Sequence, residues 1–233
     1  MELANLIPLI TTIVAFTFMG LLLWQYLKRR KIHQIIWTIA MALYGVSAFM
    51  EYLANSDVLG PSAVLIKIYY VSAAPLVGLL GAGVLYLLVK RKISNMYLGI
   101  VVGLALILLV GGSFASINDQ SLAEGFKKGL PQGFKEASTS FPFPTARLPS
   151  ILLNSTGGLI LIGGALYSYV KDRRRTYNIP LILGGLLPST GGTLLGILNN
   201  ADVFFEFELA GTVFLFLGFV MSMGYLSKRD KKE

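Results

Sequence analysis

The 233-residue sequence has no cysteine, one histidine and few charged residues, 14% of the total. The absence of cysteine excludes a disulfide scaffold, a thiol nucleophile and a cysteine-ligated zinc site, and a lone His33 excludes a histidine-rich metal site. Soluble domains carry about 25% charged residues, so this chain could not cover its surface with polar groups. A soluble cytosolic globule and a disordered protein are therefore excluded, and no metal or cofactor is predicted.

Long apolar segments take the place of charge in this sequence. Apolar residues make up 55% of the chain, and the mean hydropathy is +0.68. A helix needs about 20 mostly apolar residues to cross the hydrocarbon core of a bilayer. Seven segments meet that requirement, at 5–27, 34–55, 62–89, 95–116, 148–170, 178–199 and 203–226. We predict an all-α membrane protein in which residues 1–233 form a single seven-transmembrane helix bundle.

Basic residues predict the orientation of this bundle. Fifteen of the 20 lysines and arginines follow the first, third, fifth and seventh segments, in the ranges 28–31, 90–92, 171–175 and 228–232. The positive-inside rule places these clusters in the cytoplasm, so the N-terminus lies outside and the C-terminus is cytoplasmic. We expect a multi-pass protein of the cell membrane. The net charge of +8 then favours anionic headgroups of the lipid bilayer, and no nucleic acid is a predicted partner because no soluble domain exists to bind it.

Polar side chains gather at one depth near the outer ends of the predicted helices. Because ionisable groups are costly inside a membrane, each one is a candidate for function. At ~1.5 Å per residue, the group lies roughly 5–11 Å below the outer boundary. The candidate ligand- or ion-binding residues are Glu51, Lys67, Tyr70, Asn154, Thr193 and Glu208.

Helical spacing separates the two acids of the last segment. Glu206 and Glu208 differ by two positions and so point about 200° apart. Glu208 shares its face with Gly211 and Thr212, and small residues mark helix contacts in membranes. We therefore expect Glu208 to point inward and Glu206 to reach the headgroups. Glu51 shares its stripe with Tyr44 in the same way.

The positive charge of Lys67 could serve either of two roles. An ion pair with Glu51 or Glu208 would lower the cost of burying both charges. Alternatively, Lys67 lies close enough to the surface to reach water along its own side chain.

The segment 117–147 is the longest predicted loop. Its prolines and glycines disfavour a long helix, although Phe126, Leu130 and Phe134 recur at four-residue spacing. We favour a solvated connector that rests on headgroups, and the alternative is a lid over an outer cavity.

Glycine is abundant, and two segments share a pattern of Ser-Thr-Gly-Gly, within 153–158 and 187–192. Broken helices at matching positions can mark transporter sites, but close helix packing explains this short match better. Pro188 must free a backbone carbonyl one turn earlier, which Ser189 and Thr190 could satisfy. The glycine run 78–83 is also interpreted as helix packing.

Two resemblances follow from these patterns. The topology is similar to that of rhodopsin-like proteins, but no lysine occurs from Ala201 to Ser227 to bind retinal. The chain more closely resembles a family of uncharacterised prokaryotic seven-helix integral membrane proteins. The residues that carry the likeness are Glu51, Tyr69, Tyr70 and the stretches 78–88, 163–168, 187–193 and 211–218. This resemblance implies the fold and no chemistry.

The polar layer favours an outward-facing site for a small molecule or an ion, in a sensor or a transporter. The alternative is a structural or partner-binding membrane subunit, or a homo-oligomer, with no ligand of its own. An intramembrane enzyme is disfavoured because no nucleophile and activating base can be paired at these spacings, so no catalytic residue is predicted.

Overall fold

The computed structural model describes residues 6–56, 59–118, 120–122, 124, 137–198 and 201–230, and its side chains are described except at 192–193, 195–198, 201–202 and 224–230. These residues are helical or form connections, and none of them forms a strand. The long helices are α1 (Ile7–Arg29), α2 (Ile32–Asn55), α3 (Ala63–Leu88), α4 (Arg91–Ser113), α7 (Leu148–Lys171), α8 (Asn178–Leu198) and α9 (Ala201–Asp230). A short π-helical segment, η2 (Phe143–Arg147), leads directly into α7.

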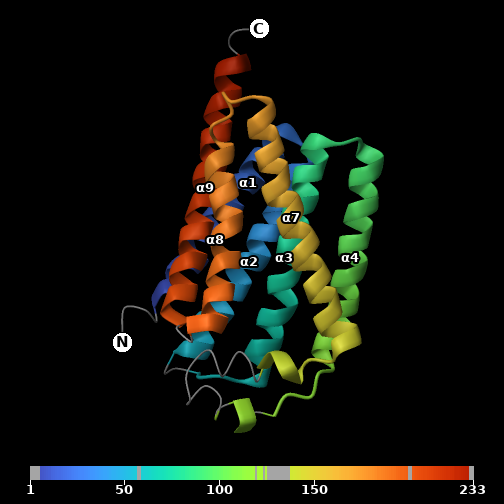
Figure 1. Ribbon diagram of the computed structural model, residues 1–233, viewed down its shortest axis with the longest axis vertical. Coiled ribbons are helices and arrows are strands. Elements are labelled where there is room, and N and C mark those ends of the chain that lie inside the picture. The colour runs from blue at the N-terminus through green and yellow to red at the C-terminus, as the bar shows by residue number, and fades with distance from the viewer. Residues whose placement is uncertain are drawn as a thin grey trace.

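Six of these helices are long and apolar enough to cross a membrane, which confirms the prediction of an all-helical chain with several spans. They are α1, α2, α3, α4, α9 and the continuous helix of η2 and α7. The α3–α4 and α7–α8 connections lie at the same end of the bundle as the last turn of α9, and the α2–α3 connection lies at the other end (Figure 1). The basic clusters at 90–92 and 171–175 therefore share one end.

Six helices form a closed ring. Along it, α1 packs on α2, α2 on α3, α3 on α7, α7 on α8, α8 on α9, and α9 returns to α1. The remaining long helix, α4, packs outside the ring against α3 and α7, at the edge of the bundle (Figure 1). Burial follows this arrangement: in the apolar, membrane-crossing part of each helix, 17% of α4 is buried inside the bundle, against 61% of α3. A large apolar face of α4 is thus left for lipid.

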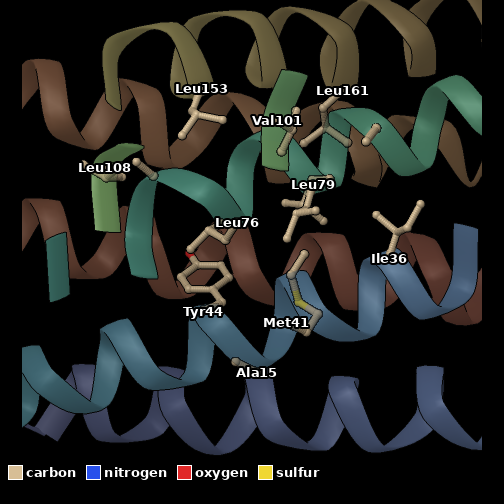
Figure 2. Packing of buried hydrophobic residues seen from close by; sticks show 14 of the residues in the cluster. Ala15, Ile36, Met41, Tyr44, Leu76, Leu79, Val101, Leu108, Leu153 and Leu161 are labelled. Carbon is tan, nitrogen blue, oxygen red and sulfur yellow. The ribbon is translucent and has the colours of Figure 1, made fainter. Parts of the chain in front are cut away.

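The core inside the ring is apolar at mid-height. Met41 and Tyr44 of α2 lie opposite Leu76 and Leu79 of α3 (Figure 2). Tyr44 is 5% exposed and Met41 is fully buried. This layer separates the two ends of the bundle interior.

Glycines allow the helix backbones to touch. A Cβ on Gly81 of α3 would lie 2.8 Å from the carbonyl oxygen of Gly157 of α7, and a Cβ on Gly157 would overlap the carbonyl oxygen of Val77. Between α8 and α9, a Cβ on Gly184 would lie 2.9 Å from the carbonyl oxygen of Gly211. These contacts confirm the interpretation of the glycine-rich stretches as packing surfaces.

The carbonyl freed by Pro188 has a different neighbour from the one we expected. Pro188 has no N–H to donate to Gly184, four residues earlier. Ser189 and Thr190 donate to the carbonyls of Gly185 and Leu186, at 3.2 and 3.0 Å. The Gly184 carbonyl instead faces Gly211, where a Cβ would come within 3.2 Å of it.

The described part of the long loop differs from the expected solvated connector. Leu122, Ala137 and Phe141 are each at most 4% exposed. Residues 137–140 form a helical turn that packs on the bundle beside α3. The predicted amphipathic residues Phe126, Leu130 and Phe134 lie outside the described residues.

The glycine contacts predict a sharp difference between two neighbouring positions in α7. Gly157→Ala should lower the free energy of unfolding by about 1–3 kcal/mol, because its Cβ would press on the α3 backbone. Gly158→Ala is the matched control, since a Cβ there meets nothing within 4 Å. Thermal unfolding in detergent measures both. Equal melting temperatures for the two variants would contradict the close α3–α7 contact.

Candidate functional site

Two acidic side chains meet inside the ring near one end of the bundle. Glu51 lies one turn before the end of α2, and Glu208 lies about two turns into α9. Glu51 is 2% exposed and Glu208 is 7% exposed, and the two carboxyl groups interact electrostatically. Two predicted site residues from helices far apart in the sequence are thus brought together.

Hydroxyl groups surround this pair. Tyr44 donates a hydrogen bond of 3.3 Å to the backbone carbonyl of Glu208, which also accepts one of 2.9 Å from Thr212. Tyr69 of α3 interacts electrostatically with both Glu51 and Glu208. We call Glu51, Glu208, Tyr44, Tyr69 and Thr212 the acid cluster. Three ring helices contribute to it.

The carboxyl oxygens of the acid cluster are poorly satisfied. Both oxygens of Glu51, and Oε2 of Glu208, are buried and make no hydrogen bond of ordinary geometry, although the Glu51 carboxyl lies close enough to Glu208 and to the Tyr69 hydroxyl to interact with both. No lysine or arginine in the described chain forms an ion pair with either acid; Arg175 and Asp172, 3.3 Å apart, form the one ion pair there. Buried polar groups are usually hydrogen-bonded, so unpartnered carboxyl oxygens mark a place for a missing positive or hydrogen-bonding group.

Lys67 does not supply that positive charge. Its Nζ donates to the backbone carbonyl of Ser113 at the end of α4, 3.0 Å away, and so the ion pair with Glu51 or Glu208, one of the two roles considered for Lys67, does not form. Lys67 thus satisfies a free carbonyl of a helix C-terminus, where a cation also complements the helix dipole.

The other predicted site residues lie apart from the acid cluster. Tyr70 is half-buried and stacks on Phe141, with ring centroids 3.9 Å apart. Asn154 is exposed on α7, where its Nδ2 donates to Ser150 Oγ at 3.4 Å. The side chain of Thr193 lies outside the described residues. Glu206 is exposed, as its helical position predicts.

A small cavity lies beside the acid cluster. Its volume is about 220 Å³, and it is lined by Ile66, Tyr69, Tyr70, Ala137, Ser138, Phe141 and Phe204. Tyr69 belongs both to this cavity and to the acid cluster. Residues 137–141 form one wall, so this part of the long loop covers the end of the bundle where the acids lie.

Sequence reasoning missed Tyr69 as a member of the site. The predicted face of the third segment ran through Lys67 and Tyr70. Tyr69 is half-buried and lies in line with the buried residues Leu65, Ser72 and Leu76, at spacings of four, three and four residues. The predicted face is itself buried at Ala74, Gly78 and Gly81, so both faces of the helix pack inside the bundle, and the charge of Lys67 drew attention away from Tyr69.

Comparisons with known proteins give no relative: no family model, no curated protein and no solved structure matches this chain. The resemblance to uncharacterised prokaryotic seven-helix proteins therefore stays a prediction.

The hydrogen bond from Tyr44 predicts a modest stability effect. Tyr44→Phe should lower the free energy of unfolding by about 0.6 kcal/mol, a typical value for a side-chain hydrogen bond inside a membrane protein. The loss is small because Thr212 still donates to the Glu208 carbonyl. Tyr52→Phe, on the same helix but only half-buried, is the control. Chemical unfolding that finds Tyr44→Phe as stable as Tyr52→Phe would contradict this role.

Proposed function

We propose that the chain is a sensor or transporter of the cell membrane that binds a proton or a small monovalent cation between Glu51 and Glu208. The observation that carries the proposal is the burial of two carboxyl groups that interact with each other and with the Tyr69 hydroxyl, with no cationic partner in the described residues. Two ionised carboxylates in such a place would repel each other and lose their hydration. A shared proton or a bound cation removes both costs.

The surrounding groups suit a small, hard cation. Carboxylate oxygens, hydroxyls and backbone carbonyls are the ligand types that such ions prefer. The acid cluster supplies two carboxyl groups and three hydroxyls in one place. A large organic ligand is disfavoured there, because the adjoining cavity is small and its walls are mostly aromatic and aliphatic.

The cation would enter from the side that we propose to be outside. The 220 Å³ cavity adjoins Tyr69, and residues 137–141 cover it. On the other side of the pair, Tyr44 and Leu76 close the interior with the apolar layer. A site that opens toward one side only is suited to binding and sensing. Transport of the cation through the bundle would also require Tyr44 to move out of its path.

We infer seven spans, with the N-terminus outside and the C-terminus in the cytoplasm. The proposal counts α8 as the seventh span, because its 21 residues contain no charged side chain and it packs along α9. The basic clusters at one end of the bundle give the orientation.

Neutral variants of the two acids test the cation site. In the wild-type protein, adding the cation that the site binds should raise the melting temperature, because a ligand that binds only the folded state stabilises that state. Glu51→Gln and Glu208→Gln should remain folded and lose that cation dependence. A series of Na⁺, K⁺ and pH values, with thermal unfolding as the readout, measures it.

Glu206→Gln is the matched control for that experiment. It removes a carboxylate two residues from Glu208 that is exposed, so its melting temperature should respond to cations as in wild type. The proposal fails if wild type shows no dependence on cation or pH, or if all three variants respond alike.

The natural absence of cysteine makes the orientation easy to test. Ser121→Cys lies in the loop that we place outside, and Thr176→Cys lies in the α7–α8 connection that we place inside; both positions are exposed. A membrane-impermeant maleimide applied to intact cells should label Ser121→Cys alone. Labelling of Thr176→Cys alone would reverse the orientation.

A further inference from the structure

A larger cavity occupies the opposite end of the ring from the acid cluster. Its volume is about 410 Å³, within the range of about 300–1,000 Å³ typical of small-molecule sites. All six ring helices contribute to its walls. Its apolar lining includes Phe18, Leu22, Met41, Leu80, Leu161 and Leu215.

The cavity mouth is polar and basic. Arg29, the last residue of α1, and Lys31, just before α2, border it on one side, and Arg175 borders it from the α7–α8 connection. No aspartate or glutamate of the described chain lines it. A hydrocarbon interior below three cations is complementary to an amphiphile with an anionic head.

Local hydrogen bonds hold Arg175 toward the mouth. Its Nη1 donates to Ser168 Oγ at 3.4 Å, and Asn178 Nδ2 donates to the same oxygen at 3.2 Å. Ser168 and Asn178 are 8% and 3% exposed, and both line the cavity. Arg175 also pairs with Asp172 through Nε, but a guanidinium has five N–H donors, so others remain for a ligand.

We propose that this cavity binds a single-chain lipid with a phosphate head, the chain inside the ring and the phosphate between Arg29, Lys31 and Arg175. Arginine favours phosphate because its planar fork donates two parallel hydrogen bonds. Three cations around one mouth fit the several oxygens of a phosphate better than the two of a carboxylate. The volume lies near the low end of the range for ligand sites, which favours one hydrocarbon chain over two.

This lipid site is independent of the proposed cation site. The deepest lining residue on α2 is Met41, and Tyr44 lies one turn further toward Glu51. The apolar layer that includes Tyr44 and Leu76 thus separates the lipid site from the cation site. A Glu51→Gln variant should bind lipid as wild type does, so the two proposals can fail separately.

The chain offers a built-in reporter for the test. It has two tryptophans, of which Trp37 lines the cavity while Trp24 is 49% exposed on the outer face of α1. In the full chain with Trp24→Phe, reconstituted in phosphatidylcholine nanodiscs, Trp37 fluorescence reports on the cavity. A dodecyl phosphate brominated on its chain should quench it saturably, because bromine quenches on close contact.

Matched arginine variants identify the head-group site. Arg29→Gln and Arg175→Gln should each raise the half-quenching concentration about tenfold, which corresponds to about 1.4 kcal/mol, near the low end for a charged hydrogen bond. Lys28→Gln and Arg174→Gln, neighbours that do not line the cavity, should leave it unchanged.

Probes with altered heads and chains decide the ligand class. A brominated dodecyl trimethylammonium should quench Trp37 without saturation, as a probe dissolved in the surrounding lipid would. Inorganic phosphate should not displace dodecyl phosphate, even at the concentration at which dodecyl phosphate saturates the site. A brominated dodecanoate that binds equally well would overturn the preference for phosphate. Equal quenching by the cationic probe, or equal effects of Arg174→Gln and Arg175→Gln, would overturn the site itself.

Discussion

The interior of this protein depends on the close approach of helix backbones at glycine. Lipid does not drive helices together as water drives apolar surfaces together, so packing must hold the ring closed. Gly81 with Gly157 joins α3 to α7, and Gly184 with Gly211 joins α8 to α9. These two contacts are separated along the ring by the α7–α8 contact. If either pair of helices were pushed apart, α2 and α9 would no longer present their acids to the same interior.

Ring closure divides the interior into three levels. The two acids are at one end, the 410 Å³ cavity is at the other, and the apolar layer that includes Leu76 and the ring of Tyr44 lies between them. Tyr44 links the two ends of the interior. Its hydroxyl donates a hydrogen bond to the backbone carbonyl of Glu208, and Met41, one turn earlier on the same helix, lines the 410 Å³ cavity. Any change at Glu208 that shifted α9 would therefore reach the cavity through Leu215, two turns further along the same helix.

The sequence was sufficient to predict the helices and the inward direction of two acids. Apolar length gave each helix to within a few residues, and the small-residue stripe of α9 distinguished Glu208 from Glu206. The partner of Lys67 could not be predicted, because the Ser113 carbonyl belongs to a helix end whose position depends on how α4 packs outside the ring. The cavity with the basic mouth also escaped prediction, since its wall is assembled from a few residues on each of six helices.

Charge distribution explains why the two ends suit different ligands. The described acids of the interior, Glu51 and Glu208, lie together at one end, and Arg29, Lys31 and Arg175 border the other. A cation is thus favoured at the first end and an anion at the second, and the apolar layer keeps the two charged regions physically apart. The basic end also carries the residues that set topology. Arg29 and Arg175 therefore fit two proposed roles at once, as members of the basic clusters at the helix ends and as donors to an anionic head group.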